Sequence, residues 1–183
     1  MKKIIAVTGM PGAGKTLACE FAKERGYTVF YVGGLTKEEL EKRGLEINEV
    51  NEREIRESLR REFGMDVYAQ KISEKIDNSD EEVILLDGVR SFEEYEFLRN
   101  KYGTDFLMLS IVVSPDLRYE RLMSREFRGL TKEECISRDM SEIQNINHGN
   151  TIAMGDYYIV NGGSDKNEFK EKVNAVLDRV VEL

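Results

Sequence analysis

The eight residues 9–16 constrain this chain more than any other part of the sequence, because they read G-M-P-G-A-G-K-T and fit the phosphate-loop pattern G-x-x-x-x-G-K-T. The apolar run 4–7 precedes them, and the helix-like stretch 17–22 follows. This strand–loop–helix context is the one in which the pattern binds polyphosphate. A glycine-rich turn that binds nothing is the alternative, and the flanking sequence counts against it.

The chemistry of such a loop explains its spacing. Glycines allow backbone N–H groups to turn towards a polyphosphate, and the following helix directs the positive end of its dipole at the same charge. Lys15 can reach the β- and γ-phosphates, and the Thr16 hydroxyl can bind Mg²⁺. We therefore predict a nucleotide-binding site made of Gly9, Met10, Pro11, Gly12, Ala13, Gly14, Lys15 and Thr16.

The charge of the chain limits the partners of this site. The 183 residues are 40% hydrophobic and carry a formal net charge of -8. Such an acidic surface argues against nucleic acid or an anionic membrane as the main partner, so a phosphate site must be a local basic cluster. No segment resembles a signal peptide or a membrane span, and we expect a cytoplasmic protein.

The few cysteines and the single histidine offer little for metal binding. Cys19 and Cys135 lie far apart without metal-ligand spacing, so neither a zinc site nor a disulfide framework is expected. His148 is the one histidine, and it is a weak candidate for a catalytic base.

Apolar strand-like runs alternate with helix-like segments along the whole chain. Several of the runs are continuously apolar, as in strands covered on both faces. The expected strands are 3–8, 28–32, 82–87, 105–113 and 157–160. Alternation with short connections predicts an α/β fold with a doubly wound parallel sheet.

Helix starts are marked by capping patterns, in which a Ser or Thr is followed three residues later by Glu. Ser164, which is followed by Asp165, is expected to cap the last helix. The predicted capping boxes are Thr36 with Glu39, Ser91 with Glu94, and Thr131 with Glu134.

Two long helical segments, 33–81 and 115–154, exceed what a simple crossover between parallel strands needs. Both follow the ends of strands, where a parallel sheet binds its ligands. We interpret them as parts that cover a substrate. The alternative is that they are extra helices that only pad the sheet.

A second candidate site follows the apolar run 83–86. Asp87 ends this run beside the phosphate loop, where a Mg²⁺-coordinating acid is needed. An ordinary Asp-Gly turn is the alternative. Arg90 leaves the same strand end and is suited to bind a second phosphate through both of its terminal nitrogens.

The third candidate site is a group of arginines between residues 118 and 138. Three of them are spaced i, i+3 and i+7, so that one helix face would present them. Mobile arginines can neutralise the charge that phosphoryl transfer spreads over the phosphate oxygens. The alternative is that these arginines lie on a solvated helix face and pair with nearby carboxylates. The group consists of Arg118, Arg121, Arg125, Arg128 and Arg138.

Taken together, these motifs resemble the P-loop nucleotide kinases. The resemblance is carried by residues 9–16, by Asp87-Gly88-x-Arg90, by the arginine-bearing helix pair and by the segment 159–164. Within that class the chain is most similar to a largely archaeal family of adenylate-kinase-related proteins. Cytidylate kinase and dephospho-CoA kinase are more distant relatives.

The resemblance implies a single P-loop domain over residues 1–183, with an acceptor-binding insertion at 33–81 and a lid at 115–154. It implies ATP and Mg²⁺ as ligands, with Asp87 in the Walker B position and Arg90 on the phosphate of the acceptor. Asn161 would pass near the ATP base, although its Asn-Gly-Gly segment also fits a simple turn. The implied lid arginines are Arg121, Arg125 and Arg138.

One segment departs from the nucleotide-kinase pattern. These kinases carry an Asp and an Arg after the second strand, where this chain has 33–37 with Lys37 as the only charge. Dephospho-CoA kinase needs a carboxylate near the end of the second strand to deprotonate a sugar hydroxyl. Residues 30–33 supply none, which favours a phosphorylated acceptor. Arg60 or Arg61 could supply the missing contact, although the sequence favours a surface arginine for either one taken alone.

The leading hypothesis is an ATP-dependent phosphotransferase acting on a small phosphorylated acceptor, most simply a nucleoside monophosphate. A nucleotide-dependent regulatory ATPase or switch is the rival class. A kinase for dephospho-CoA or another metabolite would differ only in the acceptor pocket. A GTPase is disfavoured, because residues 100–103 lack the Asp of the base-reading motif.

Overall fold

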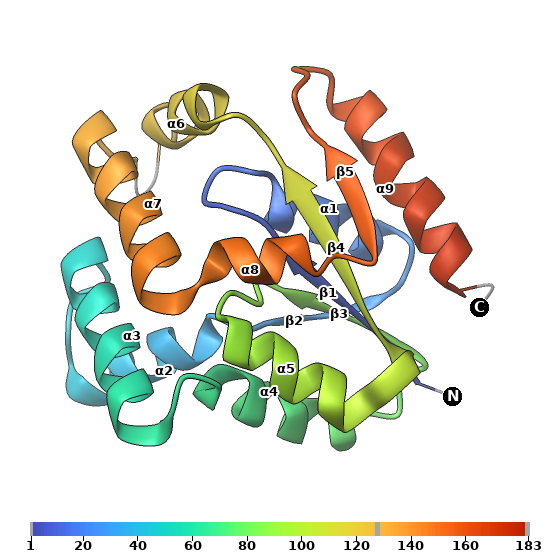
Figure 1. Cartoon of the computed structure of the whole chain (residues 1–183), viewed down its shortest axis with the longest axis horizontal. Helices are drawn as coiled ribbons and strands as arrows, with labels where there is room; N and C mark the ends of the chain where they lie inside the picture. Colours follow the sequence, from blue (N-terminus) through green and yellow to red (C-terminus); the bar gives the residue numbers. More distant parts are fainter. Residues whose placement is uncertain (1, 127–128, 182–183) are drawn as a thin grey trace.

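The computed structural model describes residues 2–126 and 129–181, and its centre is a five-stranded sheet (Figure 1). All neighbouring strands pair in parallel, in the order β2-β3-β1-β4-β5. The strands are β1 (Lys3–Thr8), β2 (Thr28–Tyr31), β3 (Val83–Asp87), β4 (Phe106–Val112) and β5 (Tyr157–Val160). The predicted α/β fold and its five strands are therefore confirmed, each within one residue at either end.

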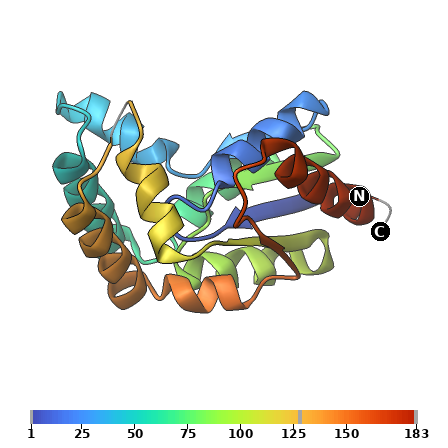
Figure 2. The ribbon, with the colours of Figure 1, turned by 90° about the horizontal axis from the view of Figure 1, so that it is seen from above.

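Helices cover both faces of the sheet and give the fold three layers (Figure 2). One face packs against α1 (Lys15–Glu24) and α9 (Lys166–Val181), whose apolar residues form one buried cluster. The other face packs mainly against α4 (Val67–Asp77) and α5 (Phe92–Tyr102), with a second buried cluster. A short 3-10 helix, η1 (Gly103–Asp105), leads from α5 into β4.

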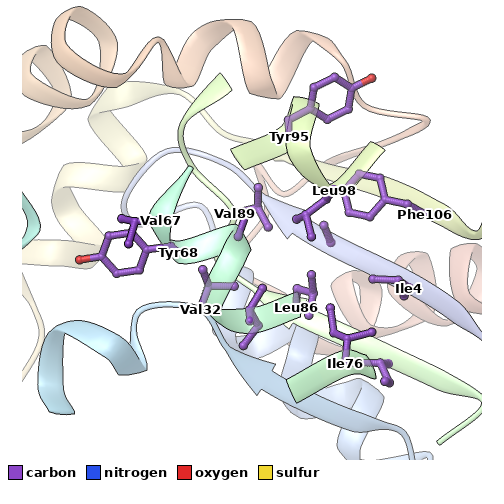
Figure 3. Packing of buried hydrophobic residues seen from close by; sticks show 14 of the residues in the cluster. Ile4, Val32, Val67, Tyr68, Ile76, Leu86, Val89, Tyr95, Leu98 and Phe106 are labelled. Carbon is purple, nitrogen blue, oxygen red and sulfur yellow. The ribbon is translucent and has the colours of Figure 1, made fainter. Parts of the chain in front are cut away.

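The central strand β1 explains the continuous apolar runs. Ile4 and Ala6 lie in the cluster under α4 and α5, while Ile5 and Val7 lie in the cluster under α1 and α9. Because successive side chains of a strand point to opposite faces, a strand covered on both sides must be apolar at every position. Figure 3 shows the first cluster, in which Ile4, Leu86, Leu98 and Phe106 pack together.

The two long segments between strands are helical, as their sequence pattern indicates. The first contains α2 (Gly34–Arg43), α3 (Glu49–Phe63) and α4, and the second contains α6 (Pro115–Met123), α7 (Lys132–Ile146) and α8 (His148–Ala153). Figures 1 and 2 both show α3 and α7 side by side at one end of the molecule. Two segments that are far apart in the sequence thus meet beside the sheet.

Two of the predicted helix caps are correct. Thr131 and Glu134 form a complete capping box at the start of α7. Ser91 caps α5 by accepting the N–H of Glu94 at 3.2 Å. The Glu94 carboxylate, however, accepts the N–H of Arg90 at 2.8 Å instead of closing the box.

The other two predicted caps are wrong. Thr36 lies inside α2, where its buried hydroxyl is 2.7 Å from the Tyr68 hydroxyl. A tertiary partner on α4 thus replaces the local capping bond. At the last helix Asp165, and not Ser164, accepts the N–H of Asn167 at 2.8 Å, so the helix starts one position later than expected.

Within the described parts of the chain, no helix is both long enough and apolar enough to cross a membrane. The longest helix, α9, has 16 residues and carries charges along its length.

Leu98 provides a test of the core between α5 and the sheet. Its side chain is fully buried, so Leu98→Ala should lower the free energy of unfolding by about 2–5 kcal/mol, through lost burial and the cavity left behind. The control Ile136→Ala removes an apolar side chain that is 45% exposed, and we expect a change within about 0.5 kcal/mol. Equal losses in urea denaturation of the two variants would contradict this packing.

Candidate functional site

The phosphate loop connects β1 to α1 at the carboxyl edge of the sheet, and its glycines are required by close packing. A Cβ on Gly14, whose φ is +108°, would lie 2.6 Å from the Asn161 amide nitrogen. A Cβ on Gly12, whose φ is +82°, would lie 2.6 Å from the Arg118 carbonyl oxygen. Both positions therefore exclude a side chain for steric as well as backbone reasons.

The start of α1 is arranged for an anion. Gly14 is its N-cap without a side-chain cap, and the first turn of the helix contains no acidic residue. The free N–H groups and the positive end of the helix dipole thus face the loop without a carboxylate of their own. The Lys15 ammonium lies over the loop and donates to the carbonyl oxygens of Gly9 at 2.6 Å and Met10 at 3.3 Å.

The surroundings of Lys15 disfavour the charged form of its amine. Burial of its amine, followed by repulsion from Arg90, lowers the pKa of Lys15 to about 8, against the partial compensation of Glu142 and Asp87. A polyphosphate placed on the loop would favour the charged amine and raise this pKa again. An anion bound at the loop would therefore stabilise the charged form of Lys15.

Asp87 and Thr16 come together because β3 pairs with β1. The register places Asp87 opposite Val7, just before the loop begins. The Thr16 hydroxyl donates to Asp87 Oδ2 at 3.0 Å. A hydroxyl and a carboxylate are hard oxygen donors, and Mg²⁺ takes one or two protein ligands beside the phosphates of a nucleotide. These two residues thus fit a Mg²⁺ ion held jointly with a triphosphate.

Arg118 and its partner Asp139 brace the loop from α6 and α7. Arg118 donates to the Pro11 carbonyl oxygen at 3.0 Å and to both carboxylate oxygens of Asp139, at 2.9 and 2.6 Å. Tyr119 donates to the same carboxylate at 2.9 Å. The Arg118 side chain is 5% exposed, so this bidentate pair is buried. It orders the loop and leaves the Arg118 guanidinium occupied by protein contacts.

Asn161 and Arg121 hold the other side of the loop. Asn161 Nδ2 donates to the Ala13 carbonyl oxygen at 2.9 Å, which ties the end of β5 to the phosphate loop. Arg121 donates to the carbonyl oxygens of Asn161 at 2.9 Å and Gly163 at 3.0 Å. Both predicted residues therefore lie against the loop.

The expected single face of arginines on one helix is not formed. Helix α6 ends at Met123, so Arg125 follows the helix and does not share a face with Arg118 and Arg121. Arg128 lies outside the described residues. Arg138 lies on α7 and faces a different part of the site.

A cleft of about 720 Å³ opens between α3 and α7. Its lining includes glutamates from both helices, with Arg90 and Glu142 at the side nearest Lys15. The small apolar part consists of Val50, Met65 and Ile146. The arginines of the lining are Arg53, Arg56, Arg60, Arg61, Arg90 and Arg138.

Glu142 links Arg90 to Arg138. Its Oε1 lies 3.3 Å from Arg90 and 3.5 Å from Arg138 Nε. Burial alone would raise the pKa of the Glu142 carboxyl, but Arg90, His148 and Arg138 outweigh it and hold that pKa well below its usual value. Glu142 in turn raises the pKa of Arg90 against the effect of burial. Both groups therefore stay charged.

His148 connects this carboxylate to the start of the phosphate loop. Its Nδ1 lies 2.7 Å from Glu142 Oε2, and its Nε2 lies 3.0 Å from the Thr8 hydroxyl. Burial lowers the pKa of His148. Because the ionised Glu142 carboxylate can only accept, Nδ1 is the donor in that contact, while the Thr8 hydroxyl donates to the Val89 carbonyl oxygen at 2.8 Å. The histidine is completely buried, and its role is to hold Glu142 in place.

Helix α3 contributes two arginines with different partners. Arg56 donates to Glu49 at 2.7 Å and to Glu52 at 3.3 Å. Arg60 instead donates to Glu94 at 2.9 Å, and its guanidinium lies 4.9 Å from the centre of the Tyr68 ring. Both line the cleft, but Arg60 is held by a carboxylate that is almost completely buried.

Sequence reasoning missed Glu49, Arg56 and Glu142, and gave His148 no partner. The spacing of Arg53, Arg56 and Arg60 at i, i+3 and i+7 could have marked the α3 face. Glu142 carries no such signal, because its partners come from three separate segments. Lys37, the cation of the unusual 33–37 segment, lies on the exposed face of α2, 3.8 Å from Glu41.

Comparisons with known proteins agree with the fold. A family model described as an AAA domain matches residues 5–141. The structure is similar to a shikimate kinase from Bacteroides thetaiotaomicron, with a TM-score of 0.65 and 16% identity over 99% of both chains. It is also similar to a gluconokinase from Sinorhizobium meliloti, with a TM-score of 0.62 and 15% identity over 98% of this chain and 94% of that one. At these identities the likeness shows the fold of the P-loop kinases.

Similarity in sequence extends over the whole chain. A UPF0200 protein from Hyperthermus butylicus is 35% identical over 179 residues, which cover 97% of this chain and 94% of that protein. A UPF0200 protein from Thermococcus onnurineus is 33% identical over 183 residues, which cover 97% of this chain and 98% of that protein. This chain therefore belongs to the UPF0200 family of archaeal proteins, which has the P-loop kinase-like fold.

Proposed function

We propose that this protein is an ATP-dependent phosphotransferase that moves the γ-phosphoryl group of Mg·ATP to a small phosphorylated acceptor, most simply a nucleoside monophosphate. One observation carries the proposal. The phosphate loop with Lys15, Thr16 and Asp87 lies beside a cleft of about 720 Å³, into which arginines from three segments converge. A site for the donor thus adjoins a cleft lined by six arginines and five glutamates, which would hold the acceptor.

The loop residues 9–16 and Asn161 would hold ATP, and Thr16 with Asp87 would hold Mg²⁺. The metal would neutralise charge on the phosphate oxygens. Lys15 would stabilise the charge that develops on the transferred group, and Arg90 would align the acceptor. Arg138 would face the acceptor from α7, with Arg121 and Arg125 on the lid beside the loop. Helices α3 and α7 would exclude water, which suppresses hydrolysis of ATP.

The acceptor side of the cleft favours a phosphorylated substrate. Its most buried ionisable carboxylate, Glu142, has a depressed pKa because Arg90 and Arg138 face it, so it is a poor base for a sugar hydroxyl. A phosphate acceptor is already ionised and needs no such base. Transfer to a hydroxyl, as the names of the similar shikimate kinase and gluconokinase suggest for those proteins, is the second candidate.

A nucleotide-dependent switch remains the rival class. Its support is the 33–37 segment, which lacks the acceptor-binding Asp and Arg and which does not line the cleft. In that case ATP would reshape α3 and α7 for a protein partner, and acceptors would not stimulate turnover.

The proposal is tested by a coupled assay of ADP release over a panel of nucleoside monophosphates and dephospho-CoA. We expect at least one monophosphate to stimulate ADP release. Lys15→Ala should then lower kcat by on the order of a hundredfold, because it removes a charge that stabilises the transition state. The control Lys23→Ala removes an exposed lysine from the same helix and should leave kcat unchanged.

Slow ADP release that no acceptor stimulates would contradict the kinase proposal. If a protein partner were then retained only in the presence of a non-hydrolysable ATP analogue, the switch would be supported instead.

The lowered pKa of Lys15 predicts proton uptake when nucleotide binds. With a pKa of about 8 in the free protein, most Lys15 amines are neutral at pH 8.5, and Mg·ADP should recharge them. Affinity should fall as the pH rises above about 8, by at most about tenfold per unit. Calorimetry at pH 8.5 in two buffers of different ionisation enthalpy measures the uptake. Lys15→Arg should abolish the uptake, and equal uptake by both proteins would refute the assignment.

Gly14→Ala should abolish Mg·ADP binding. The new Cβ would displace Asn161 from the loop, in addition to the strain of a positive φ. The control Gly26→Ala has a similar φ of +85° but open space around its Cβ. It should cost about 1 kcal/mol of stability and leave binding intact. Equal binding by the two variants, measured by calorimetry, would count against the role of the loop.

A further inference from the structure

One carboxylate in the cleft links the two helices that form its walls. Glu49, in the first turn of α3, accepts from Arg56 at 2.7 Å through Oε1 and from Arg138 of α7 at 3.2 Å through Oε2. A carboxylate gripped from two sides by guanidinium groups has the contacts that a phosphoryl group would receive in the same place.

The surrounding charges bring three guanidinium groups close together. Burial, followed by repulsion from Arg90 and Arg138, lowers the pKa of Arg56 despite its bond to Glu49. Glu142 contacts Arg90 and Arg138 on the other side, and Glu52 contacts Arg56 at 3.3 Å. Each of these carboxylates carries a single charge, so a phosphate dianion in place of Glu49 would reduce the repulsion among the guanidinium groups further.

The two carboxylates differ in how firmly they are held. Glu142 is 8% exposed and is fixed by His148, which in turn contacts Thr8. Glu49 is 28% exposed and lies at the edge of the cleft, beside Val50, whose exposure is 76%. Glu49 can therefore turn into solvent, whereas Glu142 cannot leave without removing the partner of a buried histidine and of two half-buried arginines.

We propose that Glu49 occupies the seat of the acceptor's phosphate in the ligand-free protein, and that Arg56 and Arg138, with Arg90 nearby, bind a phosphate monoester there once Glu49 swings out. Only the identification of the bound anion as the phosphate of the acceptor rests on the proposed function. Arg56, and not Arg60 or Arg61, then supplies the contact that the 33–37 segment lacks. Arg60 is already held by Glu94 and Tyr68.

The exchange would also change what links α3 to α7. At present the two helices are joined through a side chain of α3. A phosphate between Arg56 and Arg138 would replace that link with one that exists only when the acceptor is bound.

The experiment measures binding of inorganic phosphate to the full chain by calorimetry, without turnover. Glu49→Gln keeps the shape of the side chain but removes the competing charge, and we expect phosphate to bind about tenfold more tightly. The matched control is Glu57→Gln, which removes the same charge from the same helix and the same cleft. Glu57 forms an ion pair with the exposed Arg53 at 2.9 Å and contacts neither Arg56 nor Arg138 within the described residues, so its removal should leave the affinity unchanged.

A second comparison separates this seat from the phosphate loop, which also binds phosphate. In Glu49→Gln combined with Arg56→Gln the gain should disappear, whereas a gain that arose at the loop would persist. Far-UV circular dichroism and thermal midpoints confirm that each variant is folded. The proposal would be overturned if Glu49→Gln did not bind phosphate more tightly, or if Glu57→Gln gained the same affinity. It would also be overturned if the gain persisted after Arg56 was replaced.

The outcomes also separate this inference from the proposed function. If Glu49→Gln gains phosphate affinity through Arg56 but no acceptor stimulates ADP release, the anion seat stands and the kinase proposal fails. If acceptors are phosphorylated but Glu49→Gln leaves both phosphate affinity and the KM for the acceptor unchanged, the kinase proposal stands and the anion seat fails.

Discussion

The parallel pairing of β1 with β3 on one side and β4 on the other is the constraint on which the rest of this structure depends. Because the strands run in the same direction, their carboxyl ends meet at one edge, where the chain must leave the sheet through loops. The phosphate loop follows β1 there, and Asp87 ends β3 next to it. The contact between Thr16 and Asp87 is thus a consequence of strand register, although 71 positions separate them in the sequence.

The polar and charged groups around this edge are connected by a series of contacts. Thr8, at the end of β1, contacts His148, which holds Glu142, which in turn faces Arg90 and Arg138. Burial makes each unpaired charge costly, so each of these groups needs the next. The end of β1, just before the phosphate loop, is therefore connected to the cleft between α3 and α7 by a continuous series of polar contacts.

Local patterns predicted much of the fold. The apolar runs located all five strands, because the central strands β1, β3 and β4 are buried on both faces and the edge strands β2 and β5 are short apolar runs. The complete capping box at Thr131 is a purely local device. The patterns failed where a tertiary partner competed. The Thr36 hydroxyl contacts the Tyr68 hydroxyl and caps no helix. Helix α6 ends at Met123, so Arg125 does not lie on its face.

The sequence by itself determined the phosphate loop, the strand that presents it and the fold class, because these depend on residues close together in the chain. Only the tertiary structure decided which charges share the cleft. Arg118 became a buried brace with Asp139, while Arg56, Glu49 and Glu142 met between α3 and α7. The physical reason is that ion pairs between distant segments depend on how the helices pack, and spacing along the chain carries no record of that packing.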